Sequence, residues 1–292
     1  MVSSKRTVLI TGCSDGGLGR FLALAFQEAG WRVIASARTV SKTKAVAEAG
    51  IEVVQLDTLS AESISAAVIE VSNLTGGSLD MVLNNAGGGY TAPVLDIQWE
   101  QARDLFELNF YSLISVTRAF LPLLRASKSG GIVVNNTSGA SLWVGAMPFA
   151  GAYNASKGAA TQLTETMRLE LAPFGIRVIN LLTGGVRTTF YDNAKNPSLP
   201  ADSIFNVAKD RVERAMGGKE IMEKNLEPMG YARKVVAKLS VSNPSHWVWA
   251  GKNSTLAWLA TFLPIGAGDS MIKKMTGLDV VETTLKEAKK TS

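Results

Sequence analysis

Residues 7–19 read TVLITGCSDGGLG and lead into RFLALAFQEAG over residues 20–30. The run from Thr7 to Ile10 is apolar and β-branched, which predicts a short buried strand, and the apolar spacing after Leu18 predicts a helix. Glycines between a strand and a helix permit a tight turn whose backbone N–H groups can reach a phosphate at the helix N-terminus. This stretch therefore predicts a strand–turn–helix unit that binds a nucleotide.

The same alternation continues along the chain. Predicted strands and helices take turns over the first 180 residues or so, which indicates an α/β fold with a doubly wound parallel sheet in a single domain, 1–292. The predicted strands are 7–10, 32–36, 51–56, 79–83, 132–136 and 176–182. The predicted helices are 18–29, 41–49, 61–73, 97–126 and 152–172.

After about residue 187 the pattern changes to a substrate loop and a C-terminal helical elaboration, 187–292, within the same domain. Helices are predicted over 201–225 and 229–241, and a last strand over 247–250. The apolar run Leu256–Gly268 is too short to span a membrane and contains Pro264. We expect it to be buried; the alternatives are a wall of an apolar substrate pocket or a patch that contacts a membrane surface.

Composition excludes several classes of protein. The 292 residues carry a net charge of +5, spread along the chain without the basic patch of a nucleic-acid-binding protein. A single cysteine, Cys13, excludes an intramolecular disulfide, and with a single histidine, His246, it leaves no zinc cluster. No signal peptide is recognisable, so we expect a cytoplasmic protein that uses no metal.

The choice of nucleotide is predicted from the end of the second strand. No acidic residue occurs between Ala29 and Ala47, where an NAD-binding site would place a carboxylate for the ribose 2′-hydroxyl. Arg38 stands at the end of that strand instead, and a guanidinium can bind a 2′-phosphate. The sequence therefore favours NADPH as the cofactor.

A tyrosine and a lysine four residues apart indicate the chemistry. Tyr153 and Lys157 lie in a predicted helix at a spacing that puts both side chains on one face. A neighbouring ammonium favours the phenolate and lowers the tyrosine pKa from about 10. Tyr153 can then exchange a proton with a carbonyl oxygen.

Together these motifs resemble the short-chain dehydrogenase/reductase family over about residues 7–190, which implies a Rossmann-type fold. The resemblance implies that Tyr153 is the general acid and base, and that Lys157 lowers its pKa and binds the nicotinamide ribose. It implies that Ser138 hydrogen-bonds the substrate carbonyl and that Asn109 helps to hold a water in a proton relay. These four residues are the predicted catalytic set.

The resemblance also implies cofactor contacts. Asp57 would contact the adenine, the backbone of Asn85-Ala86-Gly87 would line the cofactor, and Val186 and Thr188 would touch the carboxamide and pyrophosphate. The predicted cofactor-binding residues are Gly12, Ser14, Gly17, Leu18, Gly19, Arg38, Asp57, Asn85, Ala86, Gly87, Tyr153, Lys157, Val186 and Thr188.

Two departures from the family pattern concern glycine-containing turns. The glycine loop is one residue longer than Thr-Gly-x-x-x-Gly-x-Gly, so either Gly16 or Gly17 is the middle glycine; we favour Gly17, which keeps the final Gly-x-Gly. Thr183-Gly184 stands where the family has Pro-Gly. We expect this change to alter the stiffness of the turn and to leave activity intact.

A third departure concerns the catalytic serine. Ser138 lies fifteen residues before Tyr153, two more than is usual, and Ser141 lies twelve before it. We favour Ser138 because Thr137-Ser138 is the immediate end of the strand 132–136. The two additional residues before Tyr153 then fall in the loop Leu142–Met147. Ser141 remains the alternative.

Within the family, the loop 13–17 and the segment Gly251–Ser254 resemble yeast-type 1-acyldihydroxyacetone-phosphate reductases and related fungal carbonyl reductases, many of them from secondary metabolism. We expect NADPH-dependent reduction of a bulky, hydrophobic ketone or aldehyde. The alternatives are NAD(P)-dependent oxidation of a secondary alcohol and a nucleotide-binding regulator without catalysis. Related enzymes pair through the helices 97–126 and 152–172, so a homo-oligomer is expected.

The substrate pocket is predicted from apolar side chains near the proposed serine and after Gly184. These residues either line a pocket or pack on the core. They are Leu142, Trp143, Met147, Phe149, Phe190 and Tyr191.

Overall fold

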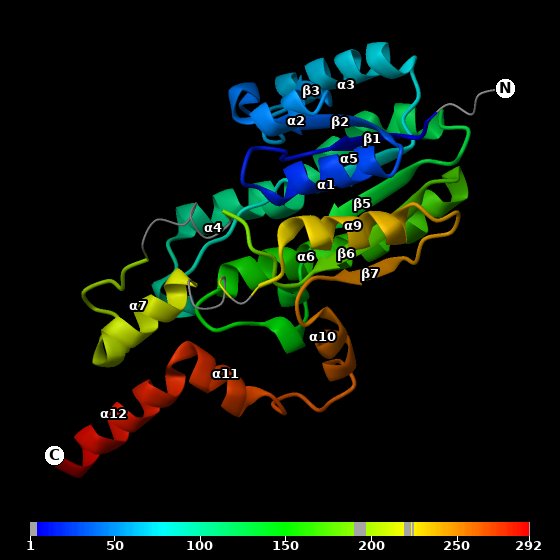
Figure 1. The fold of residues 1–292 in the computed structure, drawn as a ribbon. Helices are drawn as coiled ribbons and strands as arrows, with labels where there is room; N and C mark the ends of the chain where they lie inside the picture. The colour runs from blue at the N-terminus through cyan, green and yellow to red at the C-terminus, as the bar shows by residue number, and fades with distance from the viewer. Residues whose placement is uncertain (1–4, 190–196, 219–222, 224, 292) are drawn as a thin grey trace.

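The computed structural model describes residues 5–189, 197–218, 223 and 225–291 (Figure 1). In this part of the chain one sheet of seven parallel strands has the order β3-β2-β1-β4-β5-β6-β7. The strands are β1 Thr7–Ile10, β2 Arg32–Ala37, β3 Glu52–Gln55, β4 Met81–Asn84, β5 Ile132–Asn136, β6 Arg177–Thr183 and β7 Trp247–Ala250. The doubly wound parallel sheet is thereby confirmed.

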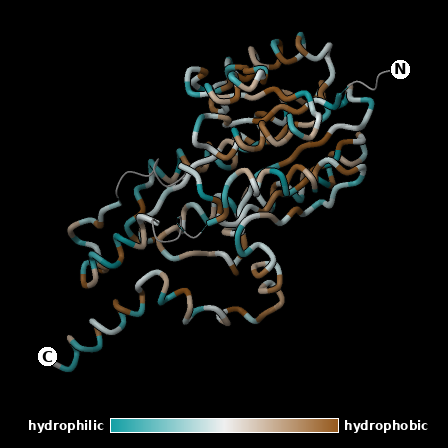
Figure 2. The backbone as a smooth tube through the Cα atoms, in the orientation of Figure 1, coloured by the Kyte–Doolittle hydropathy of each residue, from teal (hydrophilic) through white to brown (hydrophobic). Residues whose placement is uncertain are grey.

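Helices cover both faces of the sheet (Figure 1). One face carries α1, α2 and α9, and the other carries α3, α5 and α6. Their bounds are α1 Leu18–Glu28, α2 Lys44–Glu48, α9 Pro228–Leu239, α3 Ala61–Thr75, α5 Ser112–Arg125 and α6 Gly151–Leu171. Successive strand residues point to opposite faces, so Val8 and Ile10 join the first core and Leu9 joins the second. Figure 2 shows the hydrophobic colour concentrated on these strands.

The strand order reverses between β1 and β4, which are neighbours although two strands separate them in sequence. At such a point the loops after the two strands diverge and leave a crevice at the carboxyl ends of the strands, where ligands bind in this architecture. The glycine loop follows β1, and the segment from Asn85 follows β4. Both therefore lie at the switch point.

The predicted helix 97–126 is interrupted. It consists of α4 (Trp99–Phe106), a π-helical turn (Glu107–Tyr111) and α5, which follow one another without a gap. A π turn inserts one extra residue per turn and changes the direction of the side chains within it. Asn109 lies in this turn.

After β6 the chain completes the sheet and then leaves it. The strand β7 forms at the predicted residues, and α9 packs on α1. The predicted helix 201–225 is shorter than expected: a 3₁₀ turn, Ile204–Ala208, precedes α7, Lys209–Gly217. Gly218 follows with a φ of 66°, a left-handed conformation that ends the helix. Residues 219–222 and 224 of that prediction lie outside the described residues.

Three further helices follow β7: α10 Ser254–Ala260, α11 Asp269–Thr276 and α12 Leu278–Thr291 (Figure 1). A third hydrophobic cluster joins α7 and α12 to the loop before α6. Its buried members are Phe149, Leu199, Val212, Met216 and Val281. This extension therefore packs beside the N-terminal end of α6.

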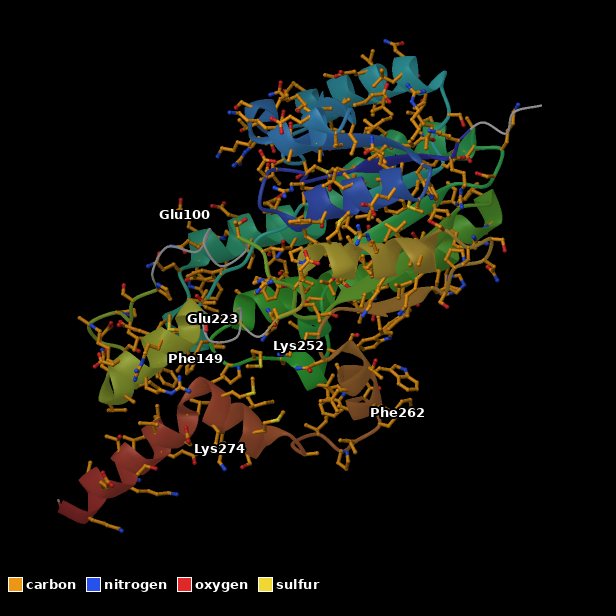
Figure 3. All side chains as sticks on the ribbon, in the orientation of Figure 1. Glu100, Phe149, Glu223, Lys252, Phe262 and Lys274 are labelled. Carbon is orange, nitrogen blue, oxygen red and sulfur yellow. The ribbon has the colours of Figure 1, made fainter. Side chains whose placement is uncertain are left out.

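The apolar run 256–268 is not buried, and the prediction of burial was wrong. Phe262 is 73% exposed and Ile265 is 84% exposed. Phe262 lies at the outer edge of the molecule in Figure 3. The helix α10 is only two turns long, and Pro264 with the glycines after it prevents a longer helix that could turn one face to the core. No helix among the described residues is long and apolar enough to cross a membrane.

Candidate active site

The glycine loop makes a tight turn between β1 and α1. Gly12 has a φ of 74°, and a Cβ on Gly19 would lie 2.4 Å from the Gly12 carbonyl oxygen, so the first turn of α1 approaches the loop only without side chains there. Gly17 is the N-cap of α1. The predicted middle glycine thus begins the helix, with Leu18 as its first residue.

Gly16, the other candidate for the middle glycine, contacts the segment after β6. Its φ is 80°, and a Cβ there would lie 2.6 Å from Cγ2 of Thr189. Thr189 also donates its backbone N–H to the Gly16 carbonyl at 3.3 Å. Gly16 therefore forms a contact between the glycine loop and the segment that follows β6.

Asp15, within the same loop, fastens it to α2. The carboxylate accepts hydrogen bonds from the backbone N–H groups of Lys44 and Ala45 at 3.1 and 3.2 Å, and the Asp15 N–H donates to the Lys42 carbonyl. The carboxylate is thereby held at the N-terminus of a helix, where the partial positive charge of the backbone stabilises it. The sole acid of the glycine loop is thus directed to α2.

Arg38 and Asp57 follow β2 and β3, at the same edge of the sheet as the glycine loop. The Arg38 side chain is exposed, and its backbone carbonyl accepts a hydrogen bond from Gln55. The Asp57 carboxylate accepts one from the Leu59 N–H at 3.0 Å. Both residues therefore lie at the carboxyl ends of their strands, and the Arg38 side chain is exposed; their cofactor contacts stay predictions.

The segment after β4 is held to the glycine loop by Thr11. Its hydroxyl accepts hydrogen bonds from the backbone N–H groups of Asn85 and Ala86, both at 2.9 Å. The Asn85 amide donates in turn to the carbonyls of Thr11 and Gly12. Next to these residues Gly87 is exposed. The loops after β1 and β4 thus form one hydrogen-bonded wall.

Lys157 is buried on α6 and holds the end of β5. Its ammonium Nζ donates to the Asn136 carbonyl at 2.9 Å. Burial lowers the pKa of Lys157 to about 8, because removal of water disfavours the charged form. Tyr153 lies one turn earlier on α6, half-buried. At neutral pH the ammonium remains mostly charged and faces the polar end of the sheet.

Asn109 ties three elements together from the π turn. Its side chain is buried, accepts from the Gly88 N–H at 2.9 Å and donates to the Gly88 carbonyl at 3.0 Å. It also donates to the Ser156 hydroxyl on α6 at 3.0 Å. A Cβ on Gly87 would lie 3.1 Å from Asn109 Oδ1 and 3.3 Å from Lys157 Nζ. Asn109 and Lys157 therefore border the same space beside Gly87.

The two candidate serines differ in their surroundings. Ser138 is the second residue after β5 and is buried, and its Oγ accepts from the Ala140 N–H at 3.1 Å, which leaves its own hydrogen for a substrate. The Ser141 hydroxyl donates to the Ser138 carbonyl at 2.6 Å. Ser141 has thereby committed its hydrogen to the backbone, which favours Ser138 as the donor to a substrate.

Val186 and Thr188 lie after β6. Val186 is buried and pairs with Leu226 in an isolated parallel bridge, which positions the segment beside the glycine loop. Thr188 is half-buried. Their neighbour Thr189 donates to the Gly16 carbonyl, so the segment lies beside the glycine loop, and its cofactor contacts stay predictions.

The predicted pocket residues separate into two groups. Phe149 is buried in the third cluster, where its ring meets that of Phe205 edge to face at 5.4 Å, so it packs on the core beside α7 (Figure 3). Trp143 is 42% exposed, while Leu142 and Met147 are half-buried in the loop before α6. Phe190 and Tyr191 lie outside the described residues.

The sequence prediction missed three residues that support this site. Asn136 donates through its side chain to Asn85 at 2.9 Å and accepts from the Thr183 hydroxyl at 2.5 Å. Thr183 also hydrogen-bonds the Tyr231 hydroxyl on α9 at 2.6 Å. The sequence signal for these residues is Thr183, which stands where the family has a proline. From the sequence alone it predicts only a change in the stiffness of the turn.

Known proteins resemble this chain in sequence and in fold. The family model described as short chain dehydrogenase matches residues 6–198. A short-chain dehydrogenase/reductase of Pestalotiopsis microspora is 43% identical over 291 residues, 99% of this chain and 100% of that protein. The NADPH-dependent 1-acyldihydroxyacetone phosphate reductase of Schizosaccharomyces pombe is 38% identical over 70% of this chain and 69% of that protein.

A solved structure of similar fold is that of a short-chain dehydrogenase from Streptomyces avermitilis. It has a TM-score of 0.73 and 27% sequence identity, and the match covers 97% of this chain and 99% of that one. The family model and the relatives thus match the region that forms the sheet and the strand-end site. The chain belongs to the short-chain dehydrogenase/reductase family of oxidoreductases.

Proposed function

We propose that this protein reduces a bulky, hydrophobic ketone or aldehyde with NADPH. The observation that carries the proposal is the buried Lys157 ammonium, fixed on the Asn136 carbonyl one helical turn after Tyr153 and beside the wall formed by the loops after β1 and β4. A buried, charged lysine near a tyrosine at a ligand-binding edge is an arrangement for proton transfer.

The residues at the edge of the sheet fit a dinucleotide with a 2′-phosphate. The glycine loop leads into the N-terminus of α1, where backbone N–H groups can bind a pyrophosphate. The exposed Arg38 guanidinium would bind the 2′-phosphate, and Asp15, directed to α2, would not repel it. The relative that is named as NADPH-dependent supports this assignment.

The bound nicotinamide would supply the hydride to the carbonyl carbon. The Tyr153 hydroxyl donates its proton to the carbonyl oxygen as negative charge develops there, and the Lys157 ammonium stabilises the resulting phenolate. Ser138 donates a second hydrogen bond to the same oxygen, with its hydroxyl oriented by the Ala140 N–H. Asn109 fixes Ser156 on α6 and so holds the helix that carries both catalytic groups.

The test is NADPH oxidation with a panel of carbonyl compounds that runs from ethyl acetoacetate to 9,10-phenanthrenequinone. Tyr153→Phe removes the proton donor and is expected to lower kcat by about 10²- to 10⁴-fold. Tyr111→Phe, the same change on a half-exposed helix surface, is the matched control and should retain activity. Equal turnover by wild type and Tyr153→Phe would remove the proposed acid.

Oxidation of a secondary alcohol uses the same groups in reverse, and no observation favours it over reduction. The intact set of Asn109, Ser138, Tyr153 and Lys157 speaks against a regulator without catalysis. The cytoplasmic location, the homo-oligomer and a role in secondary metabolism stay predictions.

A further inference from the structure

Two chains of hydrogen-bonded polar side chains cross the carboxyl ends of the strands, one on each face of the sheet. The α6-side chain runs from Asn84 through Asn135 to Thr164 on α6, with bonds of 2.9 and 3.0 Å. The second, the α9-side chain, has four members that are joined by side-chain hydrogen bonds. They are Tyr231, Thr183, Asn136 and Asn85.

The direction of every hydrogen bond in the α9-side chain follows from its donors. Asn136 Oδ1 can only accept, so Thr183 gives it its single hydrogen, and Tyr231 must then donate to Thr183. Asn136 Nδ2 donates to Asn85, which donates on to the carbonyls of Thr11 and Gly12. In each of these hydrogen bonds the donor lies on the side of α9 and the acceptor on the side of the glycine loop. Hydrogen bonds aligned in this way polarise and strengthen one another.

Asn136 connects this chain to the catalytic lysine. Its side chain lies between Thr183 and Asn85, and its backbone carbonyl accepts the hydrogen bond from Lys157. A rotation of the half-buried Asn136 side chain would leave the Thr183 hydroxyl without its acceptor and the Asn85 oxygen without its donor, which is costly. The Thr183 hydroxyl therefore fixes a residue that serves the glycine loop on one side and the lysine on the other.

We propose that Thr183 is a positioning residue, which through Asn136 sets both the glycine loop that receives the cofactor and the Lys157 ammonium. The inference rests on the proposed function. A proline at this position has no hydroxyl and could not form either hydrogen bond. The departure from the family's Pro-Gly thus exchanges a rigid ring for a hydrogen-bonded link to α9.

Tyr231 is suited to its end of the chain. It is 1% exposed, and burial raises the pKa of its hydroxyl above the usual value, which favours the neutral form that can donate a hydrogen bond. Thr183 lies half-buried at the end of β6. A valine there has nearly the shape of threonine and lacks only the hydroxyl.

The experiment compares three variants of the full-length chain. Thr183→Val removes the hydroxyl, and Thr183→Ser keeps it. Thr164→Val, the control, makes the same change in the α6-side chain. Thr164 is fully buried, and its hydroxyl bonds to Asn135 and the Ala160 carbonyl instead of to Asn136 or Lys157. The Kd for NADPH is measured by tryptophan fluorescence. The dependence of kcat on pH is measured with 9,10-phenanthrenequinone or the best carbonyl of the panel.

Thr183→Val should weaken NADPH binding about tenfold, the scale of one lost buried hydrogen bond. It should also move the alkaline limb of the kcat profile to lower pH, where this limb reports the loss of the Lys157 ammonium charge. A more loosely held Asn136 carbonyl stabilises that charge less, so the pKa of Lys157 falls. Thr183→Ser should restore both values, and Thr164→Val should lower the Tm while it leaves both unchanged.

Two results would overturn the inference: a Thr183→Val enzyme with wild-type Kd and pH profile, or the same changes in Thr164→Val, which would mean general loosening. The proposed function fails separately. If the wild type binds NADPH but reduces no carbonyl, the function is wrong and the Kd values still decide the role of Thr183. If it does not bind NADPH, both are wrong.

Discussion

Among the residues that the structure describes, two pairs of a phenylalanine and a tryptophan meet edge to face, and their surroundings are opposite. Phe26 and Trp31 lie between α1 and the sheet, with centroids 5.1 Å apart and exposures of 0% and 5%. Trp258 and Phe262 lie on and after α10, 5.5 Å apart, with exposures of 44% and 73%. The ring geometry is similar, and only the first pair is removed from water.

The difference separates the packed sheet from the exposed C-terminal segment. Around β1 every layer is filled, and polar groups at the strand ends are paired with one another. The segment 254–275 exposes several large apolar side chains instead, among them Leu256, Phe262 and Ile265. A protein gains stability from the first arrangement, whereas exposed apolar surface of this kind is usual where another molecule makes contact.

The largest expected effect is on the buried pair. Phe26→Ala removes a fully buried ring and should lower the free energy of unfolding by about 3–5 kcal/mol, since a cavity is left. Urea denaturation followed by circular dichroism measures it. A loss below about 1 kcal/mol would mean that the packing between α1 and the sheet is looser than described.

Arg38 tests the open edge of the same region. Arg38→Ala should weaken NADPH binding by about 10- to 100-fold, the scale of charge-assisted hydrogen bonds to a phosphate, and leave NADH binding unchanged. Arg103→Ala on α4 is the matched control. Equal losses for NADPH and NADH would contradict a contact with the 2′-phosphate.

Lys157 tests the buried edge through pH. Its pKa is lowered to about 8 in the folded protein, so the unfolded chain binds more protons between pH 8 and about 10. Burial of the ammonium lowers the free energy of unfolding at lower pH, and this loss is recovered as pH rises through this range. Relative to Lys157→Met, the wild type should gain about 1–2 kcal/mol in unfolding free energy between pH 7.5 and 9.5. A pH-independent difference would show that the lysine is solvated.

The smallest effect is expected at the exposed pair. Phe262→Ala should change the free energy of unfolding by less than about 0.5 kcal/mol, because the ring is mostly in water already. The same denaturation experiment applies. A cost close to that of Phe26→Ala would show that the segment is packed in solution, and the contrast between the two pairs would disappear.

Strand positions were predictable because strands buried on both faces are continuous apolar runs. Each predicted strand is present: β1, β5 and β7 have the predicted bounds, and the other four differ by one or two residues at their ends. The residues of the predicted site also lie together at the strand ends, since parallel strands bring their following loops to one edge. Their roles in catalysis and cofactor binding stay predictions.

What the sequence could not predict depends on distant contacts. Asn136 and Thr183 are 47 positions apart, and Thr183 and Tyr231 are 48 apart, so no local pattern joins them. The exposure of Phe262 depends equally on what lies next to α10, because apolar composition alone is the same for a buried and an exposed segment. The shorter α7 follows from its left-handed Gly218, which helical periodicity does not detect.

Phe149 connects the packing of the C-terminal extension to the start of α6. Its φ of 65° is a left-handed conformation that costs a non-glycine residue roughly 1–2 kcal/mol, and its ring is kept in place by Phe205 and the cluster formed by α7 and α12. It lies four residues before Tyr153, where α6 begins. Linkage is reciprocal, so a substrate that draws the start of α6 into a new position must also shift the stability of α7 and α12. Changes in those two helices, remote from the reacting atoms, would thereby alter substrate affinity.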